Sequence, residues 1–200
     1  MRLFILSLFI LTMLGASEEY NSIKKSYLSS YNYEQMGKYS EAIKVLAPLH
    51  LKYPKGYTLN LRFGWLFFLD KKYNDAQKHY KIAALSKPYA IEPRLGLIRV
   101  DLATASYTKA EQVAQELLKV DYYNYYANIY ITQALIAQKK YDIAYSVVSK
   151  MLAIYPTDVS FLELLALVYE KTQSPYLEEV YEDILILDPN NVFVNNKKGL

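Results

Sequence analysis

Two histidines, His50 and His79, are the side chains best suited to chemistry at neutral pH. An imidazole can transfer protons or bind a metal in this range. There is no HExxH motif, and neither histidine has a second ligand four residues later. We therefore expect both to be surface or packing residues, with His79 mostly exposed, and we predict no metal site.

The other motifs that carry chemistry are missing from the sequence. It contains no GxGxxG, no Walker loop and no GxSxG. The paired acids Glu18-Glu19 and Glu178-Glu179 are adjacent, and adjacent helical residues do not converge on one substrate. The absence of cysteine excludes thiolate chemistry and zinc–sulfur sites. We expect no catalytic residues, no cofactor and no enzymatic activity.

The composition is that of a globular chain with balanced charge. The 200 residues are 52% hydrophobic and 22% charged, with a formal net charge of +3. The basic residues are scattered rather than clustered on one stripe. This charge pattern argues against nucleic acid as a partner.

The N-terminus has the layout of a signal peptide. Arg2 precedes the almost wholly apolar segment Leu3 to Leu14, and Gly15-Ala16-Ser17 supplies small residues for cleavage. Twelve helical residues span about 18 Å, against about 30 Å of hydrocarbon. We predict a signal peptide over 1–17 and export to the periplasm or envelope of a bacterium, with a retained anchor as the alternative.

Three columns of residues share a period of 34. A tyrosine, an alanine three residues later and a proline twelve residues after that recur together. The members are Tyr39, Tyr73, Tyr107 and Tyr141; Ala42, Ala76, Ala110 and Ala144; and Pro54, Pro88 and Pro156, with Tyr122 in place of the remaining proline. Such a period indicates a stack of one repeated unit.

The period and the columns resemble the tetratricopeptide repeat family. The resemblance implies an all-α, right-handed superhelical solenoid of about five helical hairpins, or ten helices. The solenoid would occupy 18–200, with repeats over 23–56, 57–90, 91–124, 125–158 and 159–191. Residues 192–200 would form a partial capping segment.

Each unit divides into two amphipathic helices joined by a short turn. In the second repeat we expect the first helix over 57–70 and the second over 74–87. Asn74, Ser40 and Thr108 are the expected N-caps of second helices. Ala76 is small because two helices should approach closely there. Pro48 should kink the second helix of the first repeat.

In this family the first helices line the concave face. The helix over 57–70 carries one apolar stripe for the core, with Phe63, and a second stripe on the opposite side. An apolar patch of this kind, with acids such as Glu34 at its ends, usually marks an interaction site. The predicted groove residues are Tyr27, Tyr31, Leu61, Trp65, Phe68, Arg99, Tyr126, Ile129 and Gln133.

The preferred function is a protein-protein interaction scaffold that binds a segment of another protein in this groove. A tight superhelix, in which these side chains pack on one another, is the alternative for the patch. Alternative functions are a carbohydrate-handling scaffold of a polysaccharide secretion system and a self-assembling structural solenoid, with a homo-oligomer possible. The carboxylate clamp found in some family members is absent, because Tyr27, Tyr31, Leu61 and Trp65 occupy its positions.

Overall fold

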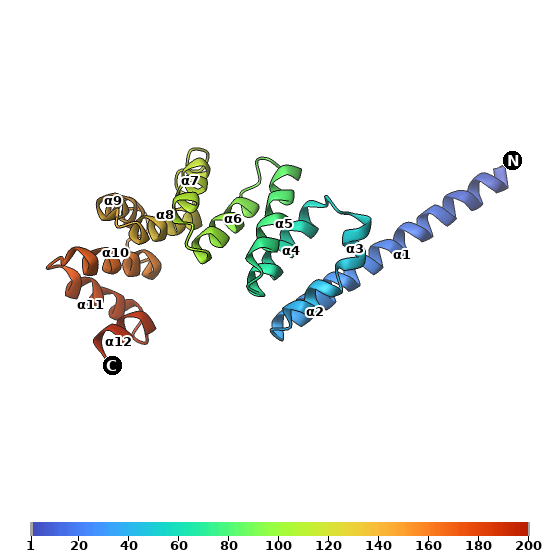
Figure 1. Cartoon of the computed structure of the whole chain (residues 1–200). Helices are drawn as coiled ribbons and strands as arrows, with labels where there is room; N and C mark the ends of the chain where they lie inside the picture. The colour runs from blue at the N-terminus through green and yellow to red at the C-terminus, as the bar shows by residue number, and fades with distance from the viewer. Residues whose placement is uncertain (1, 200) are drawn as a thin grey trace. The chain divides into compact units, whose positions relative to one another are not determined.

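The computed structural model describes residues 2–199, with side chains from Glu18 to Gly199. Over these residues the chain is helical and contains no strand (Figure 1). The helices are α1 (Arg2–Gln35), α2 (Tyr39–Lys44), α3 (Ala47–Lys52), α4 (Tyr57–Leu69), α5 (Tyr73–Ser86), α6 (Glu92–Ala103), α7 (Tyr107–Leu118), α8 (Tyr125–Ala137), α9 (Tyr141–Leu152), α10 (Val159–Thr172), α11 (Leu177–Leu187) and α12 (Val192–Lys198). The predicted signal peptide, 1–17, lies outside the residues with described side chains.

The predicted fold class is confirmed, because α1 to α11 form five hairpins. The first helices are α1, α4, α6, α8 and α10, and each is followed by a second helix. The chain divides into two compact units, Met1–Pro93 and Arg94–Leu200. None of the helices among the described residues is both long enough and apolar enough to span a membrane.

A left-handed residue reverses the chain within every hairpin. Gly37, Lys71, Ala105, Lys139 and Gln173 all have positive φ, between 54° and 69°, and they recur every 34 residues. At α4, the N–H of Lys72 donates to the carbonyl of Phe67, and the N–H of Lys71 donates to Phe68. This is the Schellman C-cap, and the same pair of bonds occurs at all five turns.

The predicted N-caps of the second helices were wrong by two positions. α5 begins at Tyr73, so Asn74 lies inside its first turn and Lys72 stands at the N-cap without a side-chain bond. Ser40 likewise lies inside α2, where its hydroxyl donates to Asp70 of the next repeat at 3.1 Å. Thr108 lies inside α7 in the same way. The Schellman turn is so short that the helix restarts at once with the tyrosine column.

Side-chain caps occur instead on later first helices. Asn124, Asp158 and Asn191 precede α8, α10 and α12 and accept from backbone N–H groups at 3.0–3.1 Å. Each bond satisfies a donor that the helix itself leaves unpaired. These caps therefore fix where the first helices begin.

The alanine column lies where helices come closest. Ala42, Ala76, Ala110 and Ala144 are all 0% exposed. In the second repeat, the opposite face of the crossing also requires a small residue. A Cβ added to Gly64 would come within 2.6 Å of the Tyr80 ring. Only hydrogen fits at this position without moving the ring.

Pro48 does more than kink the second helix of the first repeat. The helix is interrupted between α2 and α3, and Pro48 lies in the first turn of α3. Proline has no backbone N–H to donate and fits there, because the first turn of a helix has no acceptor for that N–H.

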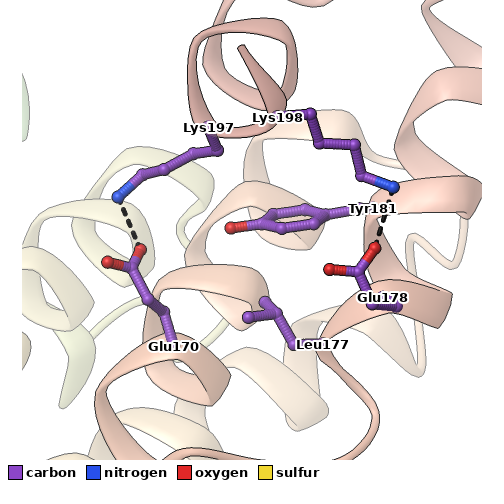
Figure 2. A pocket seen from close by; sticks show the side chains of 6 residues that line it. All are labelled: Glu170, Leu177, Glu178, Tyr181, Lys197 and Lys198. Carbon is purple, nitrogen blue, oxygen red and sulfur yellow. Dashed lines mark hydrogen bonds and ion pairs between the residues drawn. The ribbon is translucent and has the colours of Figure 1, made fainter.

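The last hairpin departs from the alanine column. Leu177 stands at that position and lines an open hollow of about 610 Å³ (Figure 2). Two ion pairs attach α12 across the hollow, Lys197 with Glu170 at 2.7 Å and Lys198 with Glu178 at 2.8 Å. The second helix of this hairpin begins at Leu177.

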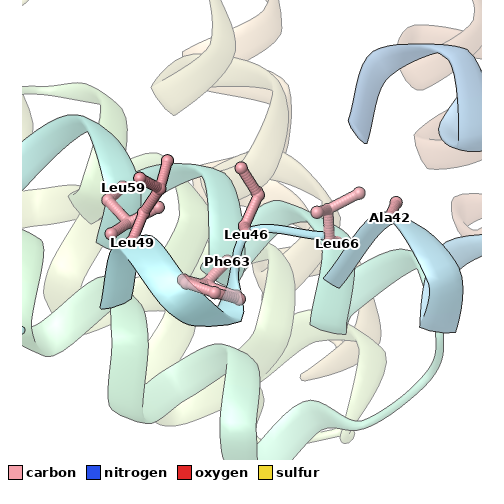
Figure 3. Packing of buried hydrophobic residues seen from close by; sticks show 6 residues of the cluster. All are labelled: Ala42, Leu46, Leu49, Leu59, Phe63 and Leu66. Carbon is pink, nitrogen blue, oxygen red and sulfur yellow. The ribbon is translucent and has the colours of Figure 1, made fainter. Parts of the chain in front are cut away.

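Separate clusters of apolar side chains form the core of each unit. In the first unit, α2, α3 and α4 contribute Ala42, Leu46, Leu49, Leu59, Phe63 and Leu66 (Figure 3). In the second unit, α9 and α10 contribute Val148, Met151, Phe161 and Leu164. A further cluster joins α10, α11 and α12. Phe63 is thus buried, as the apolar stripe predicts, together with Leu59 and Leu66.

The left-handed residues of the turns lead to a stability prediction. Lys71→Gly should raise the free energy of unfolding by about 0.5–1 kcal/mol, because glycine adopts positive φ without a steric cost. Gly37→Ala should lower it by about 1 kcal/mol through backbone strain, since no atom lies within 4 Å of the added Cβ. Urea denaturation of both variants measures the two effects.

Lys78→Gly is the control, because Lys78 is an exposed residue in the interior of α5. It should destabilise the protein, as glycine does inside a helix. Midpoints that move the same way for Lys71→Gly and Lys78→Gly would contradict the role of the left-handed turn.

Candidate functional site

The two histidines pack together with aromatic rings in the first unit. His79 is 8% exposed, so the expectation that it would be mostly exposed was wrong. Its ring stacks on Phe63 and Phe67 at 5.0 and 5.2 Å, and His50 meets it edge-on at 5.2 Å. These are packing contacts. Among the described residues, no group of three or more His, Asp or Glu side chains is arranged to hold a metal.

His79 is buried in a neutral form that one hydrogen bond orients. Asn60 uses its amide N–H to donate to the carbonyls of Pro54 and Gly56, so its Oδ1 accepts from Nδ1 of His79 at 2.8 Å. Burial lowers the pKa of His79 to about 4, and His50 and Lys78 add repulsion. The imidazole is therefore uncharged at neutral pH and links α5 to the loop before α4.

Five of the predicted groove residues lie in the first unit. Trp65 and Phe68 are half-buried on α4, and their rings stack at 6.0 Å. Tyr31 on α1 is 49% exposed, whereas Tyr27 packs partly against the core of Figure 3. Leu61 is half-buried. The helix face opposite the core stripe is thus more accessible than that stripe, yet it is not fully open.

An ion pair between α1 and α4 connects two of these residues, Tyr31 and Trp65. Arg62 of α4 is only 6% exposed; it pairs with Glu34 of α1 and donates to Ser30 at 3.1 and 3.3 Å. Its guanidinium also lies 3.9 Å from the centroid of the Tyr31 ring. The other oxygen of Glu34 accepts from Nε1 of Trp65 at 2.6 Å. We call Ser30, Glu34, Arg62 and Trp65 the Glu34 clasp.

The clasp changes the interpretation of Glu34. The sequence suggests an acidic end to the groove, but this carboxylate already has an Arg and a Trp as partners. The clasp fixes the positions of Tyr31 and Trp65, so these rings are held in place before any partner binds. Preorganisation of this kind reduces the entropy cost of binding.

The other four predicted residues lie in the second unit. Tyr126 is 56% exposed and stacks on Tyr130 at 6.3 Å. Burial raises the pKa of Tyr130, and the nearby positive charge of Arg99 opposes that shift. Ile129 packs against the α9–α10 core, and Gln133 is exposed. The structure thus groups Arg99 with Tyr126 through Tyr130, and the joining of all nine residues in one groove stays a prediction.

Comparison with known proteins identifies the fold. Neither a family model nor a curated relative matches the chain. Among solved structures, MamA 41–end from Desulfovibrio magneticus RS-1 is similar over 86% of this chain and 97% of its own, with 13% identity and a TM-score of 0.74. TTC0263, a thermophilic TPR protein in Thermus thermophilus, has 12% identity and a TM-score of 0.70, covering 88% and 96%. The fold is the tetratricopeptide repeat.

A further match with the tetratricopeptide fold is YrrB, described as a TPR protein with an unusual peptide-binding site. It has 12% identity and a TM-score of 0.65, and the alignment covers 86% of this chain and 89% of that one. At these identities the similarity establishes the fold alone. The ligand of this chain must be inferred from its own residues.

Sequence reasoning missed Arg62 and Ser30 of the clasp. Arg62 stands among apolar residues on α4, where a long charged side chain suggests solvent exposure. The available signal was register: Glu34 and Arg62 lie on consecutive first helices of a tetratricopeptide stack, and Ser30 occupies the small-residue position of Gly64. A buried cation with a serine and a glutamate in reach was therefore foreseeable from the repeat alignment.

The buried His79 generates a pH prediction. Its pKa in the folded state, about 4, is lower than the ordinary 6.5. Between these values the unfolded state binds more protons, so stability falls as pH falls from about 6.5 to about 4. The loss from this group is about 3 kcal/mol when the shift is converted to energy. His79→Gln keeps an N–H donor for Asn60 but does not titrate, so its stability should depend less on pH.

Urea denaturation at several pH values between 4 and 7 measures the difference between the two proteins. Taking the difference removes the common contribution of the carboxylates. Equal pH slopes for the wild type and His79→Gln would mean that His79 does not titrate as a buried group.

Proposed function

We propose that this chain is an exported protein-protein interaction scaffold, which binds a segment of another protein on the exposed face of its first helices. The observation that carries the proposal is the aromatic surface of the first unit. Tyr31, Trp65 and Phe68 lie next to the buried Glu34 clasp and remain partly accessible.

The chemistry of this surface favours a protein partner. Trp, Tyr and Arg are the residues that most often dominate binding energy in interfaces, since they are large and lose little entropy. The rings of Trp65 and Phe68 are stacked, and the indole N–H already has an acceptor in Glu34. The remaining accessible surface is largely apolar, which suits the apolar face of a helical or extended segment.

The proposal also states that the scaffold has a binding role and no enzymatic activity. The solved structures that share this fold include one described as having a peptide-binding site, which agrees with a binding role. The two histidines, which are the side chains best suited to proton transfer, are engaged with phenylalanine rings. Carbohydrate handling and self-assembly remain outcomes that the same binding experiments would reveal.

Export is a separate element of the proposal. It is based on the apolar segment Leu3 to Leu14 and the small residues that follow it. Export would place the scaffold in a bacterial periplasm or cell envelope, where it would bind other exported proteins.

Trp65→Ala should abolish most partner binding. An aromatic anchor at a hot spot contributes about 2 kcal/mol or more, or roughly thirtyfold in affinity. The partner is first captured from an envelope extract with residues 18–200 as bait, and a Trp65→Ala bait is run in parallel. The partner that the wild type enriches should be lost with Trp65→Ala.

Two variants control this experiment. Tyr89→Ser removes a 95% exposed ring outside the clasp and should retain the partner. Phe63→Ala removes a side chain that is 3% exposed and should cost about 3–5 kcal/mol of stability, more than Trp65→Ala. Retention of the partner by a folded Trp65→Ala protein would refute this face as the site.

Export predicts that the mature chain lacks its first sixteen or seventeen residues. Intact-mass analysis of the protein recovered from its producing cell measures this directly. A mass that retains Met1 through Ala16 would instead support a membrane anchor.

A further inference from the structure

The loop between α7 and α8 breaks the proline column of the repeats and presents a cluster of tyrosines. Tyr122 stands where the other repeats have proline. The segment from Asp121 to Tyr126, which runs into the first turn of α8, reads Asp-Tyr-Tyr-Asn-Tyr-Tyr. We call this segment the tyrosine loop. It lies wholly in the second unit.

The rings of the tyrosine loop are exposed although they are large and apolar. Tyr122 is 58% exposed and Tyr123 is 51% exposed, and their rings meet edge to face at 4.9 Å. Tyr155, from the loop before α10, is 41% exposed and meets Tyr125 at 6.2 Å. Tyr125 packs against the core through Phe161, at 5.3 Å between ring centroids. Core packing does not explain the rings of Tyr122 and Tyr123, which remain more than half exposed.

The backbone of the loop is held in one position by side chains. The carbonyl of Tyr122 accepts from Nδ2 of Asn128 at 3.1 Å and from Nζ of Lys150 at 3.3 Å. Asn124 donates to Asp121 at 3.0 Å while its Oδ1 accepts from the N–H of Ala127. A surface that is fixed in advance loses little entropy when it binds.

One cation already lies on these rings. Nζ of Lys150 is 4.0 Å from the centroid of Tyr122 and 5.7 Å from that of Tyr123. It also donates to Oδ1 of Asn128 at 2.6 Å. Burial lowers the pKa of Lys150. The contact shows that the two rings are arranged to receive an ammonium on one side, while more than half of each residue remains exposed.

Carboxylates at the loop add to the attraction for cations. Asp121 accepts from the neutral amide of Asn124, and Asp158 accepts from the hydroxyl of Tyr125 at 3.0 Å and from the N–H of Phe161. Neither carboxylate forms an ion pair within the described side chains, 18–199. Ring faces and carboxylates both favour positive charge, and the two carboxylates outnumber the one ammonium, that of Lys150, which lies on the rings.

We propose that the tyrosine loop, together with Tyr155 and Asp158, binds a lysine- or arginine-bearing segment of another protein. The cationic side chains lie on the exposed faces of Tyr122, Tyr123 and Tyr155, and Asp121 and Asp158 supply the opposite charge. This surface is independent of Trp65 and the Glu34 clasp, which belong to the first unit.

The net charge of the chain does not favour a basic peptide, so binding of such a peptide is a stringent test of the loop. The whole protein is +3, so a basic peptide gains nothing from the overall field and must be attracted locally. The probe is a fluorescein-labelled peptide of alternating Lys and Ser, and its anisotropy is measured against the full chain. A peptide of alternating Glu and Ser and a neutral glucose oligosaccharide are the comparison probes.

Three variants of the loop separate the contributions of ring and charge. Tyr122→Ser with Tyr123→Ser should weaken binding of the Lys-Ser peptide by roughly five- to thirtyfold, since two exposed cation–π contacts are lost. Tyr122→Phe with Tyr123→Phe keeps the rings and should change the affinity by less than about threefold. Asp121→Asn with Asp158→Asn keeps the helix cap and should weaken binding by roughly two- to tenfold.

Tyr89→Ser and Trp65→Ala should leave the peptide affinity unchanged, and circular dichroism confirms that each variant is folded. If Trp65→Ala loses the captured partner but still binds the Lys-Ser peptide, the Trp65 surface and the tyrosine loop bind separately. The proposal is overturned if the Lys-Ser peptide does not bind, or if the serine double variant binds it as well as the wild type. It is equally overturned if the Glu-Ser peptide or the oligosaccharide binds in its place.

Discussion

Each hairpin of this protein depends on one residue that must adopt a left-handed backbone conformation. Two hydrogen bonds close across the end of the first helix at that residue, and in the first four hairpins the second helix begins two residues later. The short turn brings the alanine column to the point where the two helices cross. Of the five left-handed positions, only Gly37 is glycine. The bonds of the turn and the packing that follows therefore outweigh the strain at the other four.

Polar groups buried between helices are satisfied by neighbouring elements in a way that differs from repeat to repeat. Asn60 and Asn128 occupy the same position of the 34-residue unit, and each donates to two carbonyls of the preceding loop. The acceptor oxygen of Asn60 receives His79, whereas that of Asn128 receives Lys150. The repeat thus keeps the two hydrogen bonds from the Asn amide to backbone carbonyls, and it varies the side chain that donates to the Asn oxygen.

The 34-residue period was sufficient to predict the hairpins. The prediction was wrong for side chains whose burial depends on a neighbouring helix. The tyrosine and alanine columns were sufficient for the hairpins, because each column records one recurring contact. The burial of His79 could not be inferred from α5 alone, since Phe63, Phe67 and Asn60 all come from α4. The helix starts were misplaced because Asn74 and Ser40 have the side chains of good caps, although the turn geometry leaves them two positions beyond the N-cap, inside the helix.

The Glu34 clasp limits how far the hairpins can be treated as interchangeable modules. A fragment that begins at α4 would keep Arg62 but lose Glu34, Ser30 and the Tyr31 ring, which are the α1 contacts that bury its guanidinium in the intact chain. The guanidinium would then face solvent, and the indole N–H of Trp65 would lose its acceptor. A cut between α3 and α4 would therefore leave Trp65 without the contacts that fix its ring, so a transplanted α4 keeps this surface only if α1 moves with it.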